Sequence, residues 1–188
     1  MNKLKYILHI WAYKKCPRRR LIEEDIEHFQ EITLIKGSYS EALCKLIDER
    51  PEIRNLLYYR LGNIRGLIKL LKLIAPPIPT LHIWTQEIGG GLFIQHGFAT
   101  VIAAKKIGKH CFINQQVTIG YNGEYAPIIG DNVKITCGAK VLGKVNIGNN
   151  VTVGANAVVV KDVPDNVTVV GVPAYIIKRG DKKVNEKL

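Results

Sequence analysis

Aliphatic side chains recur at every sixth position through the C-terminal half of the chain, with one longer interval of ten residues. These positions are Ile107, Ile113, Ile119, Ile129, Ile135, Val141, Ile147, Val153 and Val159. A period of six fits neither an α-helix nor a single alternating strand. It is typical of a coil of three short strands, each of which turns a side chain inward. Three hexapeptides make a coil of about 18 residues, and stacked coils share one core, so the pattern predicts a parallel β-helix.

The N-terminal part of the chain follows a helical period instead. Ser38 and Glu41 have the spacing of a capping box, and Pro51 suits a first helical turn. Apolar residues then recur at helical spacing until three prolines between residues 76 and 79 end the pattern. We therefore predict a mainly β chain with a helical region over residues 1–78, a β-helix domain over 79–178 and a polar C-terminal tail over 179–188.

Two irregularities interrupt the hexapeptide period. Ile119 and Ile129 are ten residues apart, so four extra residues within 121–127 must leave the coil as a loop. Earlier, the step from Ile94 to Val101 is seven residues and contains His96. Because insertions on repeat scaffolds often carry function, both places are candidate parts of a site.

Composition narrows the class of partner. The chain has 188 residues, a net charge of +11 and a pI near 9.5, which favours anionic partners. Residues 1–80 hold 15 Lys and Arg against 9 Asp and Glu, and residues 81–188 hold 12 against 7, so the positive charge is spread along the chain. With no basic motif interleaved with aromatic residues, we expect no nucleic-acid partner.

The cysteines and the apolar runs bear on location. The four cysteines lack C-x-x-C spacing, which argues against a structural zinc site. The N-terminus fits a signal peptide poorly, and no apolar run is long enough for a membrane span, so a cytoplasmic location is expected. The basic, amphipathic pattern between Arg54 and Lys72 leaves two interpretations open. It is compatible with weak contact with a membrane surface, but an ordinary helix packed on a trimer is the favoured interpretation.

Several segments resemble the hexapeptide-repeat acyltransferases, and most of all their serine acetyltransferase-like branch. These segments are Gly-Leu-Phe-Ile-Gln-His at 91–96, Ile-Asn-Gln-Gln-Val-Thr-Ile-Gly at 113–120, Ile-Thr-Cys-Gly-Ala-Lys-Val-Leu-Gly at 135–143, Gly-Ala-Asn-Ala-Val-Val at 154–159 and Gly-Val-Pro-Ala at 171–174. The resemblance covers roughly residues 80–178. It implies a left-handed β-helix, acetyl-CoA as co-substrate without a metal, and a homotrimer with cofactor grooves between neighbouring β-helices. It also implies that His96 is the catalytic residue.

The chemistry of acetyl transfer fits His96. The reaction needs a base for the acceptor hydroxyl, and a histidine with a pKa near 6.5 serves at neutral pH. The alternative is a solvated surface histidine.

Stacking extends the argument to the cofactor. Residues two positions after the aliphatic residue of successive coils should form a column, which runs His96, Gln115, Cys137 and Ala155. A column of small residues suits the slender pantetheine arm, so we predict cofactor contacts from this column and its neighbours, and phosphate contacts from two lysines. The predicted cofactor residues are Cys137, Gly138, Ala155, Asn156, Lys161 and Lys178. The alternatives are subunit contact through the small residues and plain solvation of the lysines.

The chain departs from the branch at the acceptor. Gln95 stands where the family has an aspartate before the histidine, and 124–127 reads Glu-Tyr-Ala-Pro where the family has Asp-Arg-His-Pro. We predict that Gln95, Tyr121 and Glu124 bind the acceptor, and that a sugar hydroxyl suits them better than L-serine, because no cation in the loop pairs with a carboxylate. Serine stays open if Arg54 or Arg60 folds over the site.

The repeats and the histidines bear on two other functions. A non-catalytic binding or scaffold protein could keep the same repeats. A β-helical zinc hydratase needs three histidines at subunit faces, and neither His96 nor His110 has a suitably spaced partner.

Overall fold

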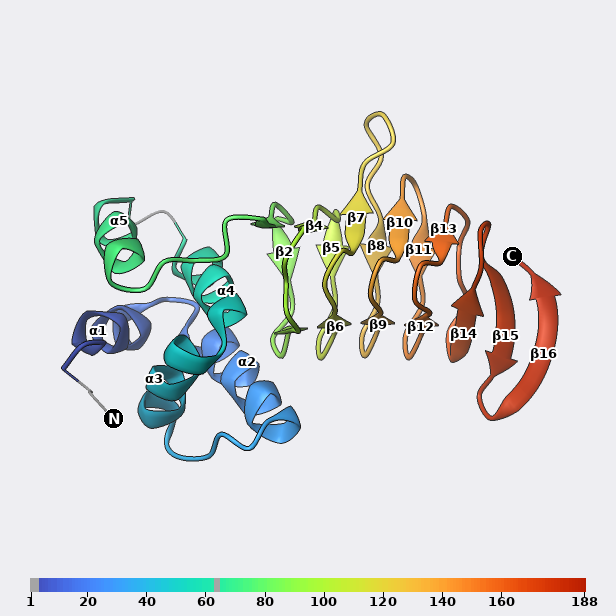
Figure 1. Ribbon diagram of the computed structural model, residues 1–188. Helices are drawn as coiled ribbons and strands as arrows, with labels where there is room; N and C mark the ends of the chain where they lie inside the picture. Colours follow the sequence, from blue (N-terminus) through green and yellow to red (C-terminus); the bar gives the residue numbers. More distant parts are fainter. Residues whose placement is uncertain (1–3, 63–64) are drawn as a thin grey trace.

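The computed structural model describes residues 4–62 and 65–188, so residues 1–3 and 63–64 of the predicted helical region lie outside it. Five helices come first and form a cluster at one end of a β-helix (Figure 1). They are α1 (Ile7–Lys15), α2 (Arg19–Ile32), α3 (Tyr39–Glu49), α4 (Pro51–Leu61) and α5 (Arg65–Ile74). The β-helix extends away from this cluster, and an antiparallel hairpin closes its far end.

Three helix boundaries lie where the sequence predicts them, whereas the break between α4 and α5 was not predicted. Ser38 and Glu41 form the capping box at the start of α3, and Pro51 occupies the first turn of α4. The helix α5 ends at Ile74, just before the prolines. A capping side chain accepts hydrogen bonds from backbone N–H groups of the first turn, which have no partner within the helix. Proline has no backbone N–H and its ring clashes with the preceding turn, so it is tolerated at the start of a helix but ends one further along.

A buried ion pair fastens the helices to the first coil. Arg60 of α4 binds Asp25 of α2 through two contacts of 2.8 and 3.0 Å, and both side chains are almost fully buried. Arg60 also donates to the carbonyls of Ile88 and Gly89 at 2.6 Å, while Asp25 accepts from the Leu92 amide at 2.9 Å. Burial raises the pKa of Asp25 to about 6, and the Arg60 charge opposes that shift.

Short strands form the three faces of the β-helix. The first sheet contains β1 (Leu81–Ile83), β4 (Thr100–Ile102), β7 (Thr118–Gly120), β10 (Lys140–Leu142) and β13 (Val158–Val159). The second contains β2 (Glu87–Ile88), β5 (Lys106–Ile107), β8 (Ile128–Ile129) and β11 (Asn146–Ile147). The third contains β3 (Phe93–Ile94), β6 (Phe112–Ile113), β9 (Lys134–Ile135), β12 (Thr152–Val153), β14 (Val167–Val170), β15 (Tyr175–Arg179) and β16 (Lys182–Lys187). Consecutive coils pair in parallel, and among the strands of the described residues the two pairings made by β15 are antiparallel.

The predicted aliphatic positions form the core. All nine are at most 2% exposed, from Ile107 to Val159. Their register is continuous, since Ile113 pairs with Ile94 on one side and Ile135 on the other. The chain therefore has the predicted left-handed parallel β-helix with an N-terminal helical region.

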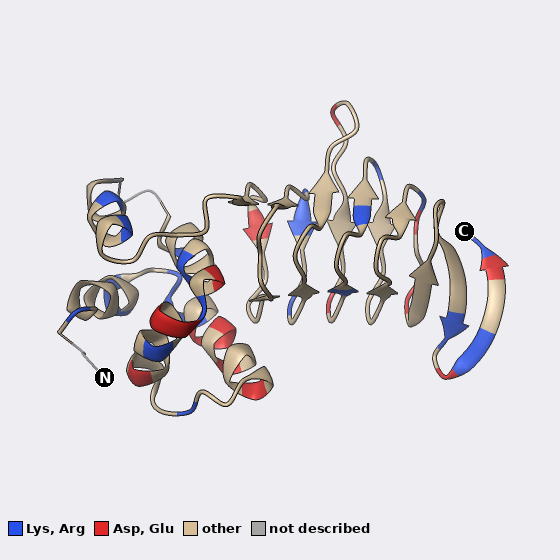
Figure 2. Cartoon of the chain, in the orientation of Figure 1, with Lys and Arg blue, Asp and Glu red and all other residues tan. Residues whose placement is uncertain are grey.

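The corners use left-handed backbone conformations. Asn132, Asn150 and Asn166 have φ values of 55 to 60° at one edge of the prism, and their side-chain amides are hydrogen bonded in a ladder. Asparagine tolerates this conformation better than most residues, so the coil turns here without glycine. Charged side chains occur at corners of the prism and on the outer face of some strands, such as Glu87 of β2 and Lys106 of β5, and they are frequent on β16 (Figure 2).

The C-terminal segment is more ordered than its composition indicates. Residues 179–188, predicted as a polar tail, contain β16, which pairs with β15 as the last strand of the third sheet. Most of its side chains are exposed, which explains why no apolar pattern predicted a strand there.

Candidate functional site

One edge of the prism carries His96. This edge, here called the histidine edge, joins the third sheet to the first and follows β3, β6, β9 and β12. Because Ile94, Ile113, Ile135 and Val153 are aligned by strand pairing, the residues two positions later form the column His96, Gln115, Cys137 and Ala155. The same register continues from Val153 to Val169 and therefore to Gly171.

His96 lies at a strained corner at one end of this column. Its φ is 65° and that of Gly97 is 53°. The predicted seven-residue step to Val101 is wrong by one residue, because strand pairing aligns Ile102 with the core residue Ile119, so the step from Ile94 is eight residues and two extra residues enter at this corner. The imidazole is exposed and makes no hydrogen bond within the described part of the chain. A free ring at this place is accessible to a substrate hydroxyl. Gln95 is already engaged, since its side-chain oxygen accepts from the Asn114 amide at 2.8 Å.

The column beyond His96 is narrow and closely packed. Gly138 has φ 72°, and a Cβ at this position would lie 2.0 Å from the Asn156 side-chain oxygen, so only glycine fits beneath Asn156. Cys137 is half-buried, whereas Ala155 and Asn156 are exposed. The predicted cofactor residues at 137, 138, 155 and 156 therefore lie together on the histidine edge.

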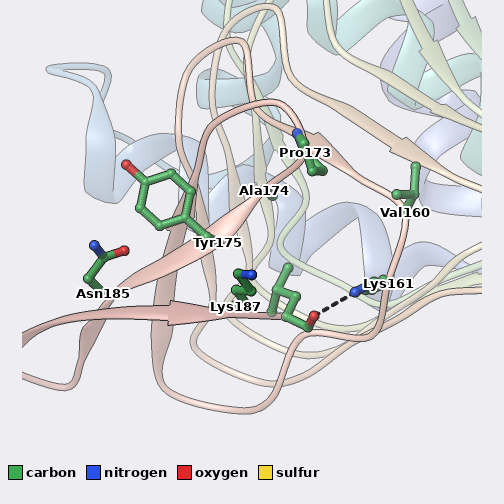
Figure 3. Close-up of a pocket in the computed structure, with 8 residues that line it drawn as sticks. Val160, Lys161, Pro173, Ala174, Tyr175, Asn185 and Lys187 are labelled. Carbon is green, nitrogen blue, oxygen red and sulfur yellow. Dashed lines mark hydrogen bonds between the residues drawn. The ribbon is translucent and has the colours of Figure 1, made fainter.

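A cavity lies at the C-terminal end of the β-helix, across the end of the first sheet. It has a volume of about 440 Å³ and extends from Pro173 and Ala174, beside the histidine edge, to Val160 and Lys161, which follow β13 at the edge between the first and second sheets. Its lining residues are Val160, Lys161, Pro173, Ala174, Tyr175, Asn185, Lys187 and Leu188 (Figure 3). Lys161 donates to the Leu188 carbonyl at 2.8 Å.

The two predicted phosphate lysines differ in position. Lys161 lines the cavity, but Lys178 of β15 is exposed and is not among its lining residues. Lys187 lines the cavity instead. Sequence reasoning missed Lys187 because it treated 179–188 as a tail, and only the pairing of β16 with β15 brings this lysine back to the coil.

The extruded loop lies on a different edge. It connects β7 of the first sheet to β8 of the second, and Figure 1 shows it projecting from the prism. Its residues Tyr121 and Glu124 are exposed, so a single chain brings neither of them to the histidine edge. Of the predicted acceptor residues, only Gln95 lies beside His96.

The base of the loop is hollowed and contains cations that the loop lacks. A cavity of about 360 Å³ is lined by Glu124, Tyr125, Lys105 and Lys144, among others. The Lys144 ammonium lies 5.4 Å from the Tyr125 ring centroid. Lys105 and Lys144 occupy the same corner of the preceding and following coils, because Ile102 and Val141, three residues before them, both pair with Ile119.

Neither Arg54 nor Arg60 of the helical region is free to bind an acceptor in this chain. Arg54 donates to the carbonyls of Ile47, Asp48 and Pro76 at 2.7 to 3.3 Å. Arg60 is held by Asp25. The suggestion that either one folds over the site is therefore wrong for the single chain.

Among residues 4–62 and 65–188, no three His, Cys, Asp or Glu side chains gather closely enough to hold a metal ion. In the same residues, no helix combines the length and apolar character needed to cross a membrane.

Comparison with known proteins supports the repeat assignment. The family described as bacterial transferase hexapeptide (six repeats) matches residues 126–161. The serine acetyltransferase of Synechococcus elongatus is 44% identical over 104 residues, which are 53% of this chain and 43% of that protein. That of Staphylococcus aureus is 46% identical over 105 residues, covering 53% of this chain and 49% of that protein. These alignments span less than half of each relative.

Solved structures are similar over most of the chain. The serine acetyltransferase of Neisseria gonorrhoeae has a TM-score of 0.68 and 29% identity, over 92% of this chain and 70% of that one. A serine acetyltransferase in complex with CoA has a TM-score of 0.65 and 25% identity, over 88% and 72% of the respective chains. The predicted resemblance to hexapeptide-repeat acyltransferases, and to their serine acetyltransferase-like branch, is thereby confirmed.

Proposed function

We propose that the chain is an acetyl-CoA-dependent O-acetyltransferase. The observation that carries the proposal is the histidine edge, where an accessible imidazole is followed by a column of small residues that leads toward a cavity with two lysines at the C-terminal end of the β-helix. The relatives support it, since they are named serine acetyltransferases and one such structure is a complex with CoA. In this proposal the pantetheine arm follows Cys137 and Ala155, and Lys161 and Lys187 face the phosphates.

The proposed reaction is a direct transfer. A ring nitrogen of His96 takes the proton of the acceptor hydroxyl as the oxygen attacks the thioester carbonyl carbon. The C–S bond then breaks, the acetyl group stays on the acceptor oxygen, and the CoA sulfur leaves with the proton held by His96. Alignment along one edge lowers the barrier because the two reactants need not find each other in solution.

We also propose that the working unit is a homotrimer. The loop with Tyr121 and Glu124 cannot reach His96 of its own chain, because the two occupy different edges. Packing of β-helices side by side would bring the loop of one chain to the histidine edge of the next. Such packing would also place Lys105 and Lys144 beside the acceptor.

The acceptor is a hydroxyl-bearing small molecule, and the relatives suggest L-serine, since one neighbouring serine acetyltransferase structure is a complex with serine. Lys105 and Lys144 are cations that suit its carboxylate. A sugar hydroxyl is the second candidate. The observation that favours it is the exposed loop itself, which offers Tyr121, Tyr125 and Glu124 and has no arginine fork.

Thiol release from acetyl-CoA tests the activity. We expect His96→Ala to lower turnover by roughly 10² to 10⁴ with little change in acetyl-CoA affinity, because a base contributes that much and does not hold the cofactor. His82→Ala is a matched control, since His82 is also exposed but lies on β1. Acetyl-CoA binding without thiol release from any acceptor would favour the non-catalytic scaffold instead.

Steady-state kinetics identify the acceptor. L-serine should be compared with a panel of sugars and glycosides at fixed acetyl-CoA. A kcat/KM for one class near 10⁴ M⁻¹s⁻¹ or above, which is roughly the lower end for cognate substrates, assigns the acceptor to that class.

A further inference from the structure

A carboxylate of the helical region lies against the corner that carries His96. Glu52 stands in the first turn of α4, which packs on β1. Gly97 follows His96 directly, and a Cβ on Gly97 would lie 3.2 Å from Glu52 Cγ and 3.0 Å from a methyl group of Leu81. The Glu52 side chain therefore occupies the space beside Gly97, directly after His96, and the missing Cβ of the glycine makes this close approach feasible.

Glu52 is buried without a hydrogen-bond partner. Its side chain is only 4% exposed, and its Oε2 atom is one of the few buried side-chain atoms without a partner in the described part of the chain. The N-terminal dipole of α4 offsets some of the cost of this burial, but it leaves Oε2 without a donor. Unpaired buried polar atoms are rare in native proteins, and a role in catalysis is one of the reasons for which they occur.

The His96 ring lacks a hydrogen-bond partner as well. Its N–H group is a donor, and the Glu52 carboxylate is an acceptor. A base works best when one ring nitrogen is held as N–H by an acceptor, since the other nitrogen then keeps its lone pair toward the substrate. Gln95 does not offer this acceptor, because its oxygen is bound to Asn114. Glu52 approaches the same corner from the helical side and has a free oxygen.

We propose that Glu52 is the positioning residue of His96. Its carboxylate accepts a hydrogen bond from one imidazole N–H when the ring turns toward the corner, fixes the tautomer, and stabilises the imidazolium that forms during transfer. The expected effect on kcat rests on the proposed function, whereas the hydrogen bond between Glu52 and His96 does not. The helical region thus takes part in the site.

Kinetics of the Glu52→Gln variant give the first test. We expect kcat to fall about 10- to 100-fold, as for other residues that orient a reactive group, with the KM for acetyl-CoA within about twofold of wild type. Glu52→Asp should recover part of the loss. Glu49→Gln, at the exposed end of α3, is the matched control and should leave kcat unchanged.

A double variant separates positioning from a general structural effect. If Glu52 acts through His96, Glu52→Gln should cost nothing further in a His96→Ala background. An unchanged kcat in Glu52→Gln, or an equal loss in both backgrounds, would overturn the proposal.

Nitrogen NMR of the histidine rings does not depend on turnover. With the His96 signals assigned by comparison with His96→Ala, the wild type should show one tautomer and Glu52→Gln a mixture of two. If the wild type releases no thiol from acetyl-CoA, the proposed function fails and the NMR result alone decides the role of Glu52. Identical His96 signals in the wild type and Glu52→Gln would refute it.

Discussion

The helical region and the β-helix bury different kinds of side chain. Within the described residues, every buried charged or imidazole side chain belongs to the helices, namely His9, Asp25, Glu52 and Arg60. The β-helix core is aliphatic, and its buried polar side chains are the hydroxyls of Thr85 and Thr100. The repeats therefore need apolar burial and turn geometry, whereas the helices also depend on individual polar contacts.

This difference follows from how each part specifies its fold. In a stack of coils, every layer finds an equivalent neighbour, so one repeated rule fixes the register. The helices have no repeat, and contacts such as Arg60 with Asp25 set how α2 and α4 meet the first coil. Sensitivity to single substitutions and to pH should accordingly be greatest in the helical region.

The largest effect should come from Arg60→Met. Removing the cation leaves Asp25 as a buried carboxylate without its charged partner, which typically costs about 3–5 kcal/mol in the free energy of unfolding. Urea denaturation followed by circular dichroism measures the loss. The double variant Arg60→Met with Asp25→Leu should recover most of it, because no charge stays buried. Equal losses in the two variants would show that packing, and not the unpaired charge, determines the cost.

Acid should reveal the next effect through His9. Burial lowers the pKa of His9 to about 4, while the unfolded chain protonates near 6.5. Because only the unfolded state gains the proton between these values, stability should fall from about pH 6.5 to pH 4, by about 3 kcal/mol.

Comparison with the His9→Phe variant isolates the contribution of His9 to the free energy of unfolding. Asp25 has a raised pKa and therefore an opposite dependence on pH, but it is present in both proteins, so its contribution cancels when the two free energies are subtracted. The difference in unfolding free energy between the two proteins should change over this range. A difference that stays constant with pH would contradict a buried neutral His9.

The smallest effect should arise in the β-helix, at Asn150. This residue has φ 56° and links Asn132 to Asn166 through its side-chain amide. Asn150→Ala should cost about 1–2 kcal/mol through the left-handed backbone, whereas Asn150→Gly keeps the conformation and should cost less. If thermal unfolding shows alanine tolerated as well as glycine, backbone conformation is not what asparagine provides here.

The sequence predicted those parts of the molecule that repeat or carry local signals. The nine aliphatic positions, the loop at 121–127, the slip at His96 and the capping box of Ser38 are each visible in a short window. Contacts between distant segments could not be predicted this way. Lys187 reaches the cavity only through the β15–β16 pairing, and Glu52 reaches Gly97 only because α4 packs on β1.

The placement of the loop and of His96 on separate edges has a consequence for mixtures of damaged chains. If the loop serves the acceptor of a neighbouring chain, as proposed, a chain lacking the histidine still donates an intact loop, and a chain with a truncated loop still offers an intact histidine. Two inactive variants, assembled together, would then restore a share of working sites, and dilution that separates the chains would abolish activity even in the wild type.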